Sequence, residues 1–128
     1  MEVIMGRKKA FDELQNSVQA KLLRKNYESW RLINFADDRG FFIIYETFKS
    51  KNILNQISGN ALKLYIFFGI SSHNETGESW YSLEYIAKYF GKSTRTISNW
   101  ILELEKVKLI KRIQLERDGV AHTFLKPY

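Results

Sequence analysis

Two short amphipathic segments follow each other between residues 82 and 102, and they constrain the fold more than any other part of the chain. Apolar residues of the first segment recur at helical spacing and predict one buried stripe, formed by Leu83, Ile86, Ala87 and Phe90. Gly91 follows at once, as expected where a helix ends through positive φ. Ser93 can then cap a second helix, whose inner face we expect to be Ile97, Trp100, Ile101 and Leu104.

The outward surface at the start of the second segment is short, polar and basic. It consists of Lys92, Thr94, Arg95, Thr96, Ser98 and Asn99, with no acid among them. Base edges and phosphates are contacted by side chains of these types. With its alanine, its glycine and this polar face, the segment resembles the helix-turn-helix of DNA-binding proteins.

The residues after the second helix predict a β-hairpin. Residues 111–115 have the composition of a strand, residues 116–119 that of a hairpin turn, and residues 120–125 that of the returning strand. Helix, helix and hairpin in this order resemble the winged helix. Two other interpretations stay open: a small helical core that only happens to end in a hairpin, and a winged helix that binds only proteins.

We expect the chain to divide into residues 1–57 and residues 58–128. In the second part, Ser58 or Asn60 can cap a helix that is apolar nearly all round, so we expect this helix to be the most buried. Trp80 and Tyr81 can add a short strand before the helix-turn-helix. The predicted fold class of residues 58–128 is therefore α+β, a complete winged helix-turn-helix.

In the first part we predict a helix over residues 8–25, with Phe11, Leu14, Val18 and Leu22 on one face. Residues 30–35 and 41–47 are predicted to be the strands of a hairpin, with a tight turn at residues 37–40 between them. A helix followed by a hairpin would then occur in each half of the chain. Superimposing the turn at residues 38–40 on residues 117–119 also aligns Val18 with Ile97 and Leu22 with Ile101.

One interpretation of this repeat is an internal dimer, in which two abbreviated winged helices of the same chain share a central antiparallel sheet. On this interpretation the protein is a monomer with internal pseudo-symmetry. Such an arrangement resembles the TraN-type accessory proteins of conjugative plasmids from Gram-positive bacteria. The first copy departs from the pattern, because no clean first helix precedes it. The second part also resembles winged helices of plasmid replication initiators and phage replication proteins.

Composition narrows the function classes. Twenty Lys and Arg against fourteen Asp and Glu give a net charge of +6, which fits a polyanionic partner. There is no cysteine, and the two histidines, His73 and His122, lie far apart in the sequence, so we expect no metal site. We expect His122 on a strand of the hairpin, either solvated or in contact with a phosphate. No glycine-rich phosphate loop, nucleophile elbow or paired carboxylates in an apolar setting are evident, so we expect no catalytic residues, no cofactor and no enzyme. No apolar run is long enough to span a bilayer, and we expect a cytoplasmic protein.

The sequence thus predicts a protein that binds double-stranded DNA sequence-specifically through the helix beginning at Ser93. Thr94, Arg95, Ser98 and Asn99 are expected to face base edges. Backbone contacts are expected from Lys92, Ser93, Thr96, Lys111, Arg112, Arg117 and Lys126. The resemblance implies a plasmid-encoded regulator or accessory factor of conjugative transfer, with other transfer or replication proteins as further partners. The alternatives are the DNA-binding domain of a replication initiator and a protein-docking module.

Overall fold

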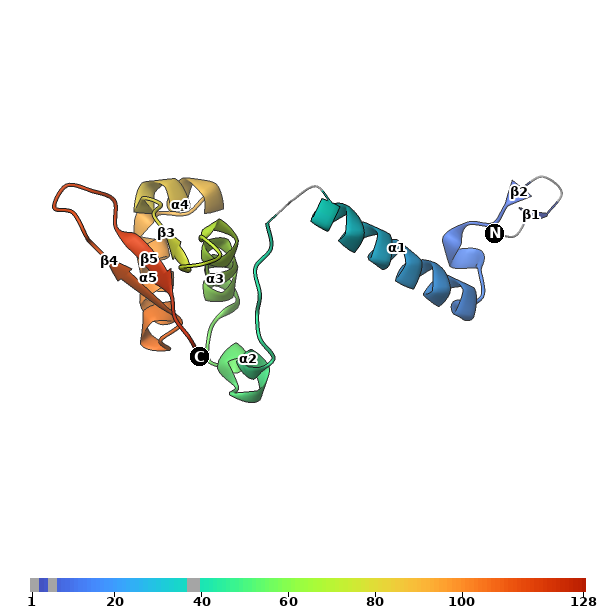
Figure 1. Cartoon of the computed structure of the whole chain (residues 1–128), viewed down its shortest axis with the longest axis horizontal. Coiled ribbons are helices and arrows are strands. Elements are labelled where there is room, and N and C mark those ends of the chain that lie inside the picture. Colours follow the sequence, from blue (N-terminus) through green and yellow to red (C-terminus); the bar gives the residue numbers. More distant parts are fainter. Residues whose placement is uncertain (1–2, 5–6, 37–39) are drawn as a thin grey trace. The chain divides into compact units, whose positions relative to one another are not determined.

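The computed structural model describes residues 3–4, 7–36 and 40–128. The chain forms two compact units, Met1–Gly40 and Phe41–Tyr128 (Figure 1). Each unit is described by itself below. Residues 41–57, which we expected to group with the N-terminal part, belong to the second unit.

A single long helix dominates the first unit. Strands β1 (Val3–Ile4) and β2 (Arg7–Lys8) pair antiparallel, and a turn of 3-10 helix, η1 (Phe11–Glu13), precedes α1 (Asn16–Ala36). The predicted helix over residues 8–25 therefore begins later and ends later than expected. Residues 30–35, predicted as a strand, are the last turns of α1, so that prediction is wrong. A short apolar run fits either structure, and no Gly or Pro occurs between residues 16 and 36 to end the helix.

The second strand of the predicted N-terminal hairpin is also absent. Residues 41–45 are irregular, and the chain continues into α2 (Thr47–Ser50) and η2 (Ile53–Asn55). The predicted turn at residues 37–40 falls mostly outside the described residues. Without this hairpin, the described part of the chain has no central sheet shared by two halves. The expectation of an internal dimer, and of the monomer that it implied, loses its structural basis.

Residues 41–57 pack against the rest of the second unit through aromatic and aliphatic side chains. Phe48 and Ile53 are 3% and 8% exposed and belong to the same core as the later helices. Phe42 lies directly over Gly69, where a Cβ would overlap its ring. The backbone amide of Tyr45 donates to the hydroxyl of Tyr128 at 2.8 Å. The segment is thus fixed by contacts that are distant in sequence.

Three helices form the core of the second unit: α3 (Gly59–Ser71), α4 (Leu83–Phe90) and α5 (Thr94–Lys106). As predicted, Ser58 caps α3, its hydroxyl accepting from the amide of Ala61 at 3.1 Å. Helix α3 contributes Leu64 and Phe68, both fully buried. It is not buried all round, however, because Ile66 and Ile70 are 36% and 70% exposed.

A three-stranded antiparallel sheet completes the unit, with strand order β3-β5-β4 (Figure 1). Strand β3 is Glu78–Ser79, β4 is Ile110–Ile113 and β5 is His122–Leu125. The hairpin of β4 and β5 confirms the prediction, with Ile110 opposite Leu125 and Ile113 opposite His122. The short strand before α4 is present too, slightly earlier than the predicted residues 80–81. Residues 58–125 therefore follow the predicted order of helix, short strand, helix, helix and hairpin.

Candidate nucleic-acid interface

The corner between α4 and α5 has the predicted local geometry. Gly91 adopts a left-handed conformation, with φ 64° and ψ 37°. The amide of Lys92 donates to the carbonyl of Ala87 at 2.9 Å, which ends α4 as in a Schellman-type motif. Ser93 caps α5, because its hydroxyl accepts from the amide of Thr96 at 3.1 Å. The chain thus leaves one helix and enters the next within three residues.

The two helices are held in this orientation by buried side chains. Ile86 and Ile97 are fully buried, and Ala87 is 5% exposed. The rings of Phe90 and Trp100 meet edge to face, with centroids 5.6 Å apart. The inner face of α5 matches the prediction, since all four of its predicted members are buried: Ile97, Trp100, Ile101 and Leu104. A core of this kind fixes the direction in which the opposite face of α5 points.

The four predicted base-contacting residues share the solvent side of the first two turns of α5. Thr94, Arg95 and Asn99 are exposed, and Ser98 is half-buried. Thr94 and Ser98, like Arg95 and Asn99, are four residues apart and therefore lie one above the other on the helix. The first turn contains no acid. This surface can donate to and accept from base edges without repelling phosphates.

The predicted backbone-contacting residues fall into different settings. Lys92, at the corner, and Lys111, on β4, are exposed, and so is Arg117 in the loop between β4 and β5. The hydroxyls of Ser93 and Thr96 lie 3.0 Å apart and bond to each other at the cap of α5. These two hydroxyls therefore already take part in the N-cap of α5.

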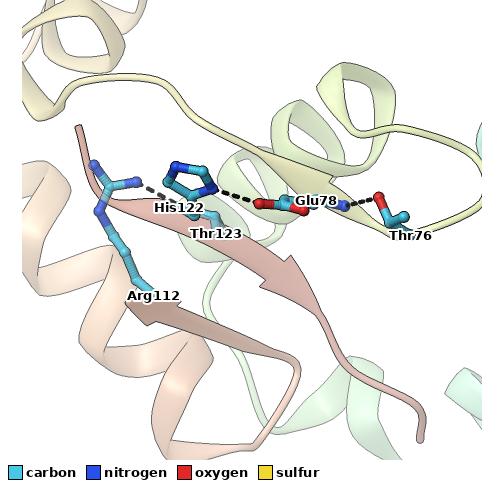
Figure 2. Close-up of polar contacts among 5 residues, drawn as sticks. All are labelled: Thr76, Glu78, Arg112, His122 and Thr123. Carbon is cyan, nitrogen blue, oxygen red and sulfur yellow. Dashed lines mark hydrogen bonds and ion pairs between the residues drawn. The ribbon is translucent and has the colours of Figure 1, made fainter. Parts of the chain in front are cut away.

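Arg112 is half-buried, and its side chain is directed at Thr123 on the neighbouring strand (Figure 2). Its guanidinium donates to the hydroxyl of Thr123 and to the backbone carbonyl of Tyr81, each at 2.8 Å. Burial lowers its pKa from the usual range, while the nearby carboxylates of Glu105 and Glu84 act in the opposite direction. Arg112, on β4, therefore links Thr123 of β5 to Tyr81, which precedes Ser82, the N-cap of α4. These bonds give Arg112 a structural role, and its expected phosphate contact stays a prediction.

Lys126 lies away from the base-contacting surface. Its amide donates to the carbonyl of Leu109 at 2.9 Å, and Leu109 comes just after the C-terminal end of α5. A helix of 13 residues is about 20 Å long, so Lys126 sits roughly that far from Ser93 along the axis of α5. A phosphate contact there would need DNA that extends well beyond the N-terminal turns of α5.

The sequence did not reveal a polar and aromatic cluster on the outer face of the sheet. His122, on β5 as predicted, pairs through Nδ1 with the carboxylate of Glu78 on β3 (Figure 2). The indole of Trp80 stacks between His73 and His122, with ring centroids 5.3 and 5.5 Å away. The cluster joins β3 to the hairpin, and Glu78 gives His122 a partner other than a phosphate.

Comparison with known proteins supports the assignment of the corner. A family model described as a helix-turn-helix domain matches residues 54–110. This match supports a helix-turn-helix DNA-binding protein, and such domains are typically not enzymes. No curated protein and no solved structure matches the chain significantly.

Among the described residues there is neither a membrane-spanning helix nor a cluster of metal ligands. No helix in the described ranges is long and apolar enough to cross a membrane. No group of three or more His, Asp or Glu side chains within residues 3–4, 7–36 and 40–128 could hold a metal ion.

Proposed function

We propose that the protein binds double-stranded DNA sequence-specifically, with the N-terminal half of α5 in the major groove. The observation on which this proposal rests most is the solvent face of that helix: Thr94, Arg95, Ser98 and Asn99 on one side of a helix whose other side is fully packed. Arg95 can pair with O6 and N7 of guanine, and Asn99 with N6 and N7 of adenine. The rigid corner at Gly91 would fix the angle at which these side chains meet the bases.

The surroundings of α5 supply cations for the phosphates. Lys92 at the corner, Lys111 on β4 and Arg117 in the hairpin loop are all exposed. In this proposal the hairpin of β4 and β5 acts as the wing of a winged helix, and its loop follows the DNA backbone beside the major groove. The net charge of +6 favours association with DNA.

For the biological role we propose a plasmid-encoded regulator or accessory factor of conjugative transfer that works with other transfer proteins in the cytoplasm. The helix-turn-helix and its hairpin fit this role, whereas the internal repeat from which the resemblance to TraN-type proteins was drawn is absent from the described residues. A replication initiator's DNA-binding domain is the second candidate of the same class.

One observation favours a protein-docking module instead. An apolar groove of about 430 Å³ lies between α3 and α4, and Ile70, Tyr85 and Tyr89 line it with at least half of each side chain exposed. A partner helix could occupy such a groove. A docking module, unlike a DNA-binding protein, has no counterions to release from DNA.

Salt-dependent binding to duplex DNA separates these functions. Fluorescence anisotropy with DNA from the protein's own operon should show an affinity that falls steeply with salt, by about 0.9 log units per phosphate contact for each tenfold rise in salt. Footprinting would then give the site and show whether it lies near a promoter, a transfer origin or a replication origin. Binding that is absent at low salt, with the protein folded, would exclude DNA binding and favour docking.

The helix face is tested with two variants of Arg95. Arg95→Ala should cost about 1–3 kcal/mol at the specific site. Arg95→Lys should restore only part of this, because an ammonium lacks the fixed planar fork of the guanidinium. Lys63→Ala, on an exposed lysine of α3, is the matched control and should leave binding unchanged. Full specific affinity in Arg95→Ala would refute the proposed orientation of α5.

A further inference from the structure

Helix α1 separates its charged residues from an uncharged face. Its charged side chains occupy about one third of its circumference, as a helical projection shows: Lys21, Arg24, Lys25, Glu28 and Arg31. Leu23, Tyr27 and Trp30 lie on the remaining surface; we call these three residues the seam. They are 56%, 63% and 59% exposed, which is unusual for three large apolar side chains on one face.

The spacing of the seam is that of a helix that packs against another helix. Its members follow each other after four and then three residues, and Ala20 and Asn34 continue the same pattern at either end. Apolar residues at this spacing form the contact line of two-stranded coiled coils. Ile33, 53% exposed, lies beside the seam and widens the apolar face.

We propose that α1 pairs with α1 of a second copy of this chain, seam against seam. A second copy supplies a stripe of the same length, spacing and apolar character, so the surface is complementary to itself. Pairing along the seam leaves the basic residues outside, where water can solvate them. Most of the stability of a helix in a protein comes from the packing of its apolar face, so burial of the seam would also stabilise α1 itself.

Asn26, an amide on the uncharged face, favours a protein partner over a lipid surface. Asn26 lies between Ile33 and Trp30 in a helical projection. Gln19 and Asn34, on the same side, already donate to the backbone carbonyls of Leu14 and Trp30 at 2.8 and 2.9 Å, so they do not bear on the choice. The amide group of Asn26 can hydrogen-bond across a protein interface, whereas hydrocarbon would offer it no partner. A basic amphipathic helix that binds membranes usually has no such interruption.

The size of the seam sets the expected strength of the dimer. Tyr27 and Trp30 leave roughly 100–150 Å² each to be covered, so the whole seam falls below the roughly 800 Å² per partner of a standard interface. The dimer should therefore be reversible, with a dissociation constant on the order of micromolar. If the proposed DNA binding holds, DNA with two half-sites would strengthen it by presenting two copies of α5 together.

Two exposed leucines of α1 give a matched pair of variants. Leu23 and Leu32 are 56% and 62% exposed and lie about two and a half turns apart, on opposite sides of the helix. Glutamine keeps the helix propensity of leucine while removing its apolar surface. Leu23→Gln therefore alters the seam, and Leu32→Gln is the same change on the charged side.

Sedimentation equilibrium of the full chain between about 1 and 100 µM is the test. We expect the parent and Leu32→Gln to dimerise reversibly, and Leu23→Gln to raise the dissociation constant about tenfold or more. A parent that stays monomeric over this range overturns the proposal. Equal weakening in both variants overturns it too, because it would show that the seam is not the contact.

Binding to vesicles distinguishes the lipid alternative. If a monomeric parent co-sediments with phosphatidylglycerol vesicles and Leu23→Gln does not, the face binds anionic lipid and the proposal fails. The dimer is also tested independently of the proposed function. A chain that dimerises through the seam and yet binds no duplex DNA would refute DNA binding and leave the pairing of α1 intact.

Discussion

Lys111 and Arg112 are neighbours on β4, yet the structure gives them opposite roles, and this contrast can be measured. Successive residues of a strand point to opposite sides of the sheet. Lys111 is exposed, whereas Arg112 is half-buried and donates to Thr123 and to the carbonyl of Tyr81. Substitution of each by alanine should therefore affect different properties of the protein.

The magnitude for Arg112→Ala follows from its two hydrogen bonds. A hydrogen bond to a charged group contributes about 1.5–3 kcal/mol, and a buried acceptor left without a partner costs a further amount. Thr123 is 1% exposed, so water cannot easily replace the guanidinium there. Because Arg112 itself is only partly buried, we expect a loss of about 2–4 kcal/mol in the free energy of unfolding.

Lys111→Ala should leave the free energy of unfolding within about 0.5 kcal/mol of the parent. It should instead weaken binding to all DNA sequences alike and reduce the salt slope by about one phosphate contact. Urea unfolding measures the first property, and anisotropy at several salt concentrations measures the second. If Arg112→Ala is as stable as the parent and loses DNA affinity as Lys111→Ala does, the structural role assigned to Arg112 is wrong.

Three further predictions concern packing and the corner between α4 and α5. Ala87→Leu should cost about 1–3 kcal/mol in thermal or urea unfolding, because the residue is 5% exposed at the contact of α4 with α5; an unchanged stability would contradict that contact. A Cβ at Gly91 would meet no atom within 4 Å, so Gly91→Val should be destabilising only because valine resists the φ of 64°. Gly91→Asn should be tolerated better, because asparagine adopts this conformation more readily. Equal stability of the two variants would show that the backbone conformation is not the cause. Gly69→Ala should displace the ring of Phe42 and lower stability by about 1–3 kcal/mol, whereas Phe42→Ala in the same background should remove the added cost.

Local signals in the sequence were sufficient for the corner between α4 and α5. The cap at Ser93 and the left-handed turn at Gly91 depend on residues within a few positions of each other. The apolar stripes repeat at helical spacing, which specifies both the helices and their buried faces. The hairpin of β4 and β5 was likewise predictable, because strand composition flanks a short turn.

The N-terminal hairpin shows where local signals are ambiguous. Residues 30–35 are an apolar run that suits a strand or the end of a helix, and only the continuation of α1 through them selects the helix. Residues 41–45 are as apolar as a strand, yet their backbone forms no ladder. Phe42 packs over Gly69, and Tyr45 bonds to Tyr128, and both contacts join segments distant in sequence.

The sequence by itself determined the helix-turn-helix and the residues that α5 presents to solvent, since short-range periodicity and capping fix both. Alternation along β4 also separates Lys111 from Arg112, but Ile110 and Ile113 fall one on each side, so the pattern does not say which side is inward. The tertiary structure decided that question. Pairing of Arg112 with Thr123 across the hairpin, and the carbonyl of Tyr81 within reach, bury the guanidinium. Burial depends on which distant segments meet, and residue spacing within one strand does not record that.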